Sequence, residues 1–69
     1  DTLTIYLSEE VTFLNKGGIL DALYQCKAPK ITIDASRTKS IDLDVLEALQ
    51  EFKFNAEQEK KATITFINL

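Results

Sequence analysis

Hydrophobic residues recur along this chain with two different periods, and these periods predict its strands and helices. A period of two marks segments 2–7, 30–34 and 62–67, where large apolar residues alternate with threonine or another polar residue. Each of these segments is expected to form a β-strand with one buried face. A short apolar stretch at 11–13 is interpreted as a further strand, antiparallel to the first and joined to it by a turn at 8–10.

The first of two helical segments lies at 15–26, where apolar residues recur three or four positions apart. This spacing predicts a short amphipathic helix, with Asn15 as its N-cap because an asparagine oxygen accepts hydrogen bonds from free backbone N–H groups. Gly17 and Gly18 weaken the expected first turn, by about 1 kcal/mol each relative to alanine. They either allow the helix to lie close to the sheet or leave this turn frayed. Cys26 is expected to be a small buried hydrophobic residue.

A longer apolar stripe predicts the second helix, over 43–60. Ser40 or Asp42 is expected to cap it, and Asp44 in the first turn suits the positive end of the helix dipole. Phe54 lies off the stripe, which makes it either a contact for a further segment or partner or an ordinary exposed aromatic residue. The buried stripe is expected to comprise Ile41, Val45, Leu46, Leu49, Phe52 and Ala56.

These segments follow one another in the order β-β-α-β-α-β, which is typical of a small α/β domain. Strands separated by helices are expected to be parallel neighbours joined by right-handed crossovers. Since each helix is apolar on one stripe only, both are expected to pack on one face of a mixed sheet of about four strands. Phe13, Phe52 and Phe66 are expected in the core, and residues 1–69 have room for this single domain only.

Composition narrows the classes of function that this chain can have. Eleven acidic and eight basic residues give a net charge of −3, which argues against nonspecific nucleic-acid binding because that needs clustered lysine and arginine. The chain has no histidine, and its one cysteine allows neither an internal disulfide nor a multi-cysteine zinc site. Most hydrolytic and zinc mechanisms are thereby removed, so we expect no enzyme, metal or cofactor. The apolar stretches are too short to span a bilayer.

Two segments together carry a family resemblance: 11–16, with the sequence VTFLNK, and 33–47, with the sequence IDASRTKSIDLDVLE. With the order of elements, they resemble the STAS domain (sulfate transporter and anti-sigma factor antagonist) of bacterial SulP-type anion permeases. The resemblance implies a noncatalytic regulatory or interaction domain of a sulfate or bicarbonate transporter, on the cytoplasmic face of the inner (plasma) membrane. Its partner would be the transmembrane transport domain of the same chain, with a cytoplasmic protein or a homodimer as alternatives.

The same resemblance implies a domain truncated at its C-terminus, because STAS domains continue into further helices. The alternative within the family is a soluble anti-sigma factor antagonist-like binding module, with nucleotide binding as a further feature. In that branch a phosphorylatable serine follows the aspartate that opens the main helix. Here Asp42 matches this aspartate and Leu43 the serine, and leucine has no hydroxyl. This departure favours the transporter branch.

The polar loop 36–40 is the main candidate for a ligand site. It joins the carboxyl end of a strand to the start of a helix, where ligands bind in open α/β sheets. The positive charges of Arg37 and Lys39 suit an anion or a nucleotide phosphate. Against such a site, the nearby aspartates repel an anion and the loop has no glycine, so solvated loop charge is the alternative. Phosphorylation of Ser36, Thr38 or Ser40 is a further hypothesis. The candidate ligand-binding residues are Ser36, Arg37, Thr38, Lys39 and Ser40.

Three aspartates flank this loop, namely Asp34, Asp42 and Asp44. They either converge as a carboxylate cluster for a hard cation such as Mg²⁺, or they act separately as helix caps and as groups that order the loop. Capping explains their spacing along the chain without a metal ion, since each aspartate stands beside an expected helix start or strand end. The sequence therefore favours the separate structural roles and predicts no metal site.

Overall fold

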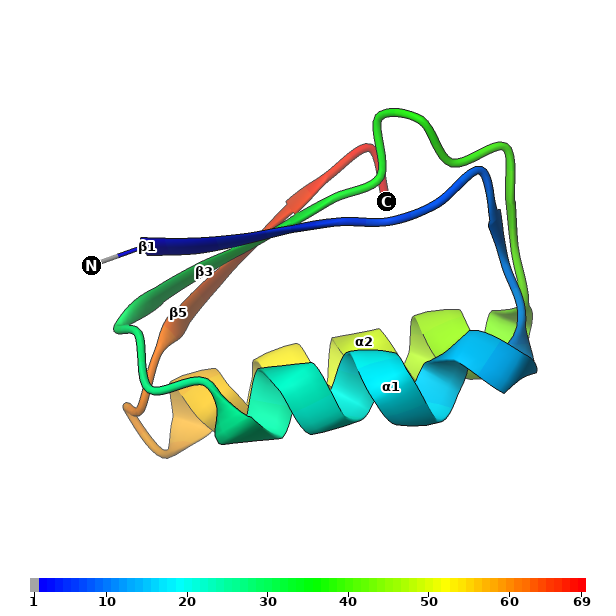
Figure 1. The fold of residues 1–69 in the computed structure, drawn as a ribbon. Helices are drawn as coiled ribbons and strands as arrows, with labels where there is room; N and C mark the ends of the chain where they lie inside the picture. Colours follow the sequence, from blue (N-terminus) through cyan, green and yellow to red (C-terminus); the bar gives the residue numbers. More distant parts are fainter. Residues whose placement is uncertain (1) are drawn as a thin grey trace.

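The computed structural model describes residues 2–69, which form a small α/β domain, as the pattern of residues predicts. The two helices lie side by side beneath the same face of the sheet (Figure 1). The main sheet contains three strands, and two further strands form a short separate ladder. The elements are β1 (Thr2–Tyr6), β2 (Glu10–Val11), α1 (Phe13–Gln25), β3 (Lys30–Asp34), β4 (Ser40–Ile41), α2 (Leu43–Gln58) and β5 (Thr63–Ile67).

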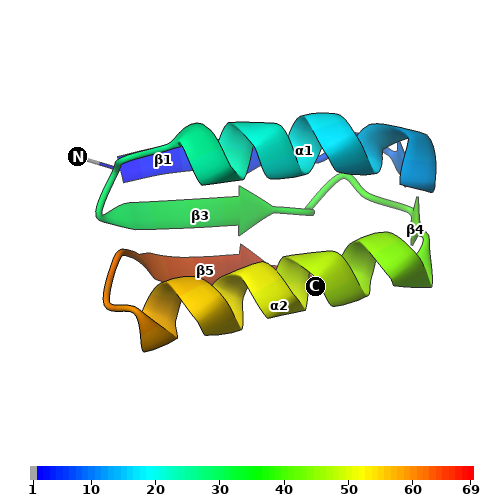
Figure 2. The ribbon, with the colours of Figure 1, turned by 90° about the horizontal axis from the view of Figure 1, so that it is seen from below.

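The main sheet has the strand order β1-β3-β5, and all of its neighbours are parallel. Each helix connects two of these strands, which is the arrangement expected for strands joined by crossovers. Seen from the helix side, α1 lies across β1 and α2 across β5, with β3 visible between them (Figure 2). The central strand β3 therefore has a neighbour on each side, and its Ile33 is fully buried.

The second strand differs from its prediction in length and in partner. The antiparallel pairing of 11–13 with the first strand is wrong, because β2 contains only Glu10 and Val11 and pairs in parallel with β4. The physical reason is the early start of α1: the chain leaves β1, descends to the helix layer and becomes helical at Phe13. After Tyr6, pairing along β3 extends only as far as the Leu7 N–H, which donates to the Asp34 carbonyl at 2.9 Å.

Thr12 is the N-cap of α1, in place of the predicted Asn15. The Thr12 hydroxyl accepts the Leu14 N–H at 3.2 Å, and the Asn15 side chain reaches back to accept the Thr12 N–H at 2.9 Å. The two side chains thus form a capping box, in which Asn15 is the reciprocal partner. An added Cβ at Gly17 or Gly18 would have no atom within 4 Å, so these glycines do not bring the helix close to the sheet.

The core forms between the helices and the lower face of the sheet. The predicted stripe of α2 is largely confirmed, since Val45, Leu49, Phe52 and Ala56 are buried, while Leu46 is half-buried. Phe66 and Cys26 pack partly buried against this core, whereas the expectation of a buried Phe13 is wrong. The opposite face of the sheet carries mostly threonine and is covered by no helix among residues 2–69. The residues of this open face are Thr2, Thr4, Tyr6, Lys30, Thr32, Asp34, Thr63, Thr65 and Ile67.

Candidate functional site

Loop 36–40 lies at the carboxyl end of the sheet, above the end of the molecule where both helices begin (Figure 1). The short β2–β4 ladder holds it there. The backbone N–H groups of Lys39 and Ser40 both donate to the Glu9 carbonyl, at 2.8 and 3.2 Å. The Asp42 N–H donates to the Val11 carbonyl at 2.9 Å. These bonds attach the loop to the segment that leads into α1, so the starts of the two helices are fixed to one another.

Asp34 orders the beginning of the loop. Its carboxylate accepts the Ser36 N–H at 2.8 Å and also accepts the Ser36 hydroxyl. These two bonds, first the hydroxyl and then the N–H, lower the pKa of Asp34, and the charge of Arg37 lowers this pKa further. Asp34, Ser36 and Arg37 line a hollow of about 250 Å³ together with Tyr6 and Leu7. The structure therefore brings a carboxylate, a guanidinium and a phenol together at this end of the sheet.

The other predicted residues of the loop are occupied by contacts within the protein. The Thr38 hydroxyl donates to the Ser8 carbonyl at 2.9 Å, and its N–H donates to the Ala35 carbonyl at 3.0 Å. The Lys39 ammonium lies 3.3 Å from a carboxylate oxygen of Glu9. Because the N–H groups of residues 36, 38, 39 and 40 are engaged, the loop does not offer the set of free N–H groups that cradles a phosphate. An anion or nucleotide at this loop stays a prediction, and so does phosphorylation of its hydroxyls.

Asp42 and Asp44 connect the two helices. Asp42 is the N-cap residue of α2, but its side chain makes no capping bond there. Its carboxylate instead accepts the N–H of Phe13, the first residue of α1, at 3.0 Å. Asp44, in the first turn of α2, lies 3.1 Å from the Lys16 ammonium of α1. The aspartates therefore act at separate places, and no metal-binding group of acidic residues or cysteine is found in the part of the chain that the structure describes.

Large apolar side chains are exposed at this same end of the molecule. Phe13 and Leu14 begin α1, and Leu43 begins α2 beside the Asp42–Phe13 hydrogen bond. Tyr6 ends β1 and shares a hollow of about 410 Å³ with Leu14. Between 63 % and 80 % of each of these side chains is exposed. We call Tyr6, Phe13, Leu14 and Leu43 the apolar patch.

The pattern of residues does not predict the apolar patch. It places Phe13 in the core, and Leu43 is notable in the sequence only for its place at a phosphoacceptor position. The available signal is positional, because Phe13 and Leu43 each directly follow a helix-capping residue, Thr12 or Asp42.

Comparison of the chain with protein-family models, with curated proteins and with solved structures found no match. No helix among residues 2–69 has both the length and the apolar composition that crossing a membrane requires. Charged and apolar side chains are exposed together at the end where the helices begin. Most of the hydrogen-bond donors around them are already bound within the protein.

Proposed function

We propose that this chain is a noncatalytic interaction domain of the STAS type, which regulates a SulP-type anion transporter. In this proposal the domain docks with the end that carries loop 36–40 and the apolar patch. The docking partner is the membrane-embedded transport domain of a longer chain that includes these residues. The domain would then act on the cytoplasmic side of the membrane, and the transported ion would be sulfate, bicarbonate or a related anion.

The observation that supports docking is the apolar patch at the starts of the two helices. Leucine and phenylalanine exposed together at one end of a domain are typical of surfaces that contact another protein. Arg37, at the edge of the hollow that contains Tyr6, forms no ion pair with any carboxylate among residues 2–69. The guanidinium is therefore available for an acidic or carbonyl group of a partner.

The fixed geometry of this end supports a regulatory role. The Asp42–Phe13 hydrogen bond and the Lys16–Asp44 ion pair join the first turns of both helices, at 3.0 and 3.1 Å. A force applied to one helix start is thereby carried to the other. Leu43 also opposes the anti-sigma factor antagonist alternative, because it is exposed where that branch carries its phosphorylated serine and it offers no hydroxyl.

Anion transport by the full-length gene product tests this function, after the gene is read upstream of Asp1 for the ten or more hydrophobic spans that a transporter requires. We expect Leu14→Asp and Leu43→Asp each to change transport by about threefold or more, because each places a charge in a dry contact. Arg37→Ala is expected to have a smaller effect in the same direction.

Phe54→Asp is the matched control, since Phe54 is 64 % exposed on α2 but lies away from the helix starts. It is expected to leave transport unchanged. A gene without membrane spans would contradict the proposal outright. Equal effects of Phe54→Asp and Leu43→Asp would place the contact on the flank of α2 and overturn the assignment of the docking end.

A further inference from the structure

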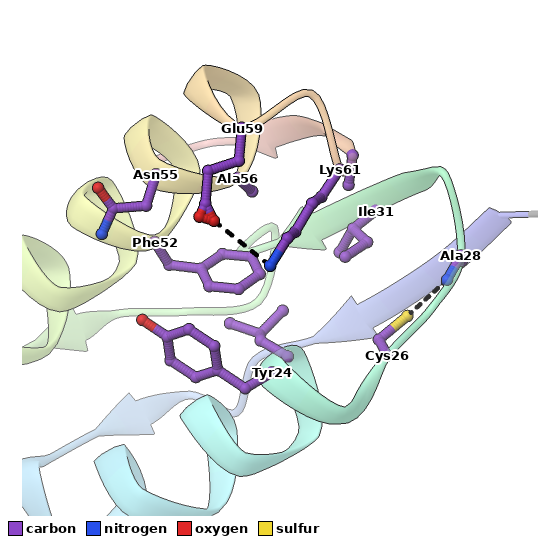
Figure 3. Close-up of a pocket in the computed structure, with 11 residues that line it drawn as sticks. Tyr24, Cys26, Ala28, Ile31, Phe52, Asn55, Ala56, Glu59 and Lys61 are labelled. Atoms are coloured by element: carbon purple, nitrogen blue, oxygen red, sulfur yellow. Dashed lines mark hydrogen bonds and ion pairs between the residues drawn. The ribbon is translucent and has the colours of Figure 1, made fainter.

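A pocket of about 230 Å³ opens at the other end of the molecule, between the C-terminal halves of α1 and α2 (Figure 3). Its apolar base is formed by the buried side chains of Leu23, Ile31 and Phe52. The pocket exists because small residues stand where larger ones would complete the core. Those small residues are Ala28, Ala56 and Ala62.

Two aromatic rings give this pocket a defined shape. Tyr24 from α1 and Phe52 from α2 pack edge to face, with ring centroids 5.1 Å apart and planes at 89°. Both rings line the pocket, so a flat ring that enters it meets one aromatic face and one aromatic edge. An apolar cavity of about 150 Å³ is known to bind benzene, and this pocket is larger. Its size therefore suits two fused rings.

The charged residues that line the pocket are Lys61 and Glu59, and further lysines stand beside the lining segments in the sequence. Lys61 extends across the mouth and lies 3.3 Å from Glu59 (Figure 3). Two more lysines, Lys27 and Lys60, belong to the adjoining connections, which are joined by the hydrogen bond from the Thr63 N–H to the Pro29 carbonyl at 2.9 Å. Neither of the two forms an ion pair within residues 2–69.

Two acidic residues, Glu57 and Glu59, stand at the end of α2 beside this pocket. Glu57 is already engaged, because its carboxylate accepts the Lys53 ammonium at 2.8 Å and the Ile64 N–H at 3.2 Å. The pair of Glu59 and Lys61 is exposed on both sides, and exposed pairs of this kind are worth about 0–1 kcal/mol. An anionic group on a bound molecule can therefore replace Glu59 as the partner of Lys61.

We propose that this pocket binds a small aromatic carboxylate with two fused rings. The rings lie against Tyr24 and Phe52, and the carboxylate meets Lys61 at the mouth. The site is separate from the apolar patch, and its existence does not depend on the function proposed above. Neutral and cationic molecules of the same shape bind more weakly, because they gain nothing from Lys61.

Titration with 2-naphthoate tests this site directly. The chain contains no tryptophan, so naphthalene fluorescence can be followed without interference. We expect saturable binding with a Kd of about 1 mM or lower. Amide chemical shifts should change in segments 23–28, 52–56 and 59–62. The neutral 2-naphthamide is expected to bind about threefold more weakly, and 2-naphthylmethylamine more weakly again.

Variants separate the contribution of charge from that of shape. Lys61→Gln should weaken 2-naphthoate binding about two- to fivefold, and Glu59→Gln should strengthen it by a similar factor, because Lys61 loses its competing partner. Lys39→Gln, at the opposite end, removes the same charge and should change nothing. Ala56→Leu fills the pocket and should abolish binding, and Ala28→Leu is a second filling variant if Ala56→Leu unfolds.

Several results would overturn the proposal. They are no saturation at several millimolar, equal affinity for the three naphthalene compounds, chemical-shift changes outside the pocket, or unchanged binding by a folded pocket-filling variant.

Discussion

The two ends of the helix pair are constructed in opposite ways. Where the helices begin, Thr12, Asn15 and Asp42 satisfy the backbone donors of α1, and large apolar side chains point into solvent. Where the helices end, buried apolar side chains form the base of a pocket that alanines leave unfilled, and Lys61 extends across its mouth. The first end presents a surface suited to another protein, and the second presents a space suited to a small molecule. The end whose backbone donors are satisfied thus exposes its apolar side chains, and the end whose core is incompletely packed contains a cavity.

Both ends depend on the same central strand, and Ile33→Ala should show this most strongly. Ile33 is completely buried in β3, so its truncation is expected to cost about 2–5 kcal/mol in the free energy of unfolding. A chain of 69 residues has little stability to spare, so this variant is expected to be largely unfolded. Urea denaturation followed by circular dichroism measures the loss. A change below 1 kcal/mol would mean that the two ends do not share one core.

Thr12→Ala should weaken the helix-start end selectively. The substitution removes the N-cap of α1 and one half of its capping box, which is expected to cost about 1 kcal/mol. Amide hydrogen exchange should accelerate in residues 13–16 and remain unchanged in residues 52–58. Thr65→Ala, on the open face of β5, is the control for loss of a threonine hydroxyl. Equal acceleration at both ends would contradict the separation between them.

Gly17→Ala should instead stabilise the protein, by about 0.5–1 kcal/mol. Both glycines of α1 have helical backbone angles, and an added Cβ meets nothing within 4 Å. The gain arises from the lower entropy of the unfolded chain, so the apolar patch and the pocket should keep their shapes. Thermal unfolding checks the direction, and a lower midpoint temperature would show that the glycine is needed for a close contact.

Each end also contains one carboxylate with a lowered pKa, and acid titration should distinguish them. The Ser36 hydroxyl is the main cause at Asp34, and the Lys53 side chain is the main cause at Glu57. A carboxyl group whose pKa is lowered in the folded state stabilises the protein at pH values above its ordinary pKa. This stabilisation is lost as the pH falls to the lowered pKa of the folded state. The acid-induced loss of stability should therefore occur below about pH 4.

Carboxyl titration by NMR can assign this effect to each end. Ser36→Ala should raise the pKa of Asp34 toward its ordinary value and leave Glu57 unchanged, while Lys53→Gln should do the reverse. A shift of both groups in either variant would show that the two ends are electrostatically coupled.

The repetitive parts of this fold were predictable, while its helix starts were not. Alternation identified β3 with both ends correct, and the apolar stripe located α2 to within two residues. The sequence predicts Asn15 as the N-cap of the first helix, but Thr12 holds that place. Of the two caps proposed for the second helix, Asp42 is the N-cap residue, but its carboxylate binds the start of α1 instead. The Asp42–Phe13 bond joins residues 29 positions apart, so no local pattern reveals it. The pocket was missed for the same reason, since its lining comes from four segments that only folding assembles.

Hydrogen exchange of the full-length gene product, compared with the isolated domain, tests the central claim most directly. If the helix-start end docks on the transport domain, amides in residues 12–16 and 36–44 should exchange more slowly in the full-length protein. Amides in residues 26–29 and 59–62, around the pocket, should exchange at the same rate in both. Slowed exchange around the pocket alone, with no change at the helix starts, would contradict the account.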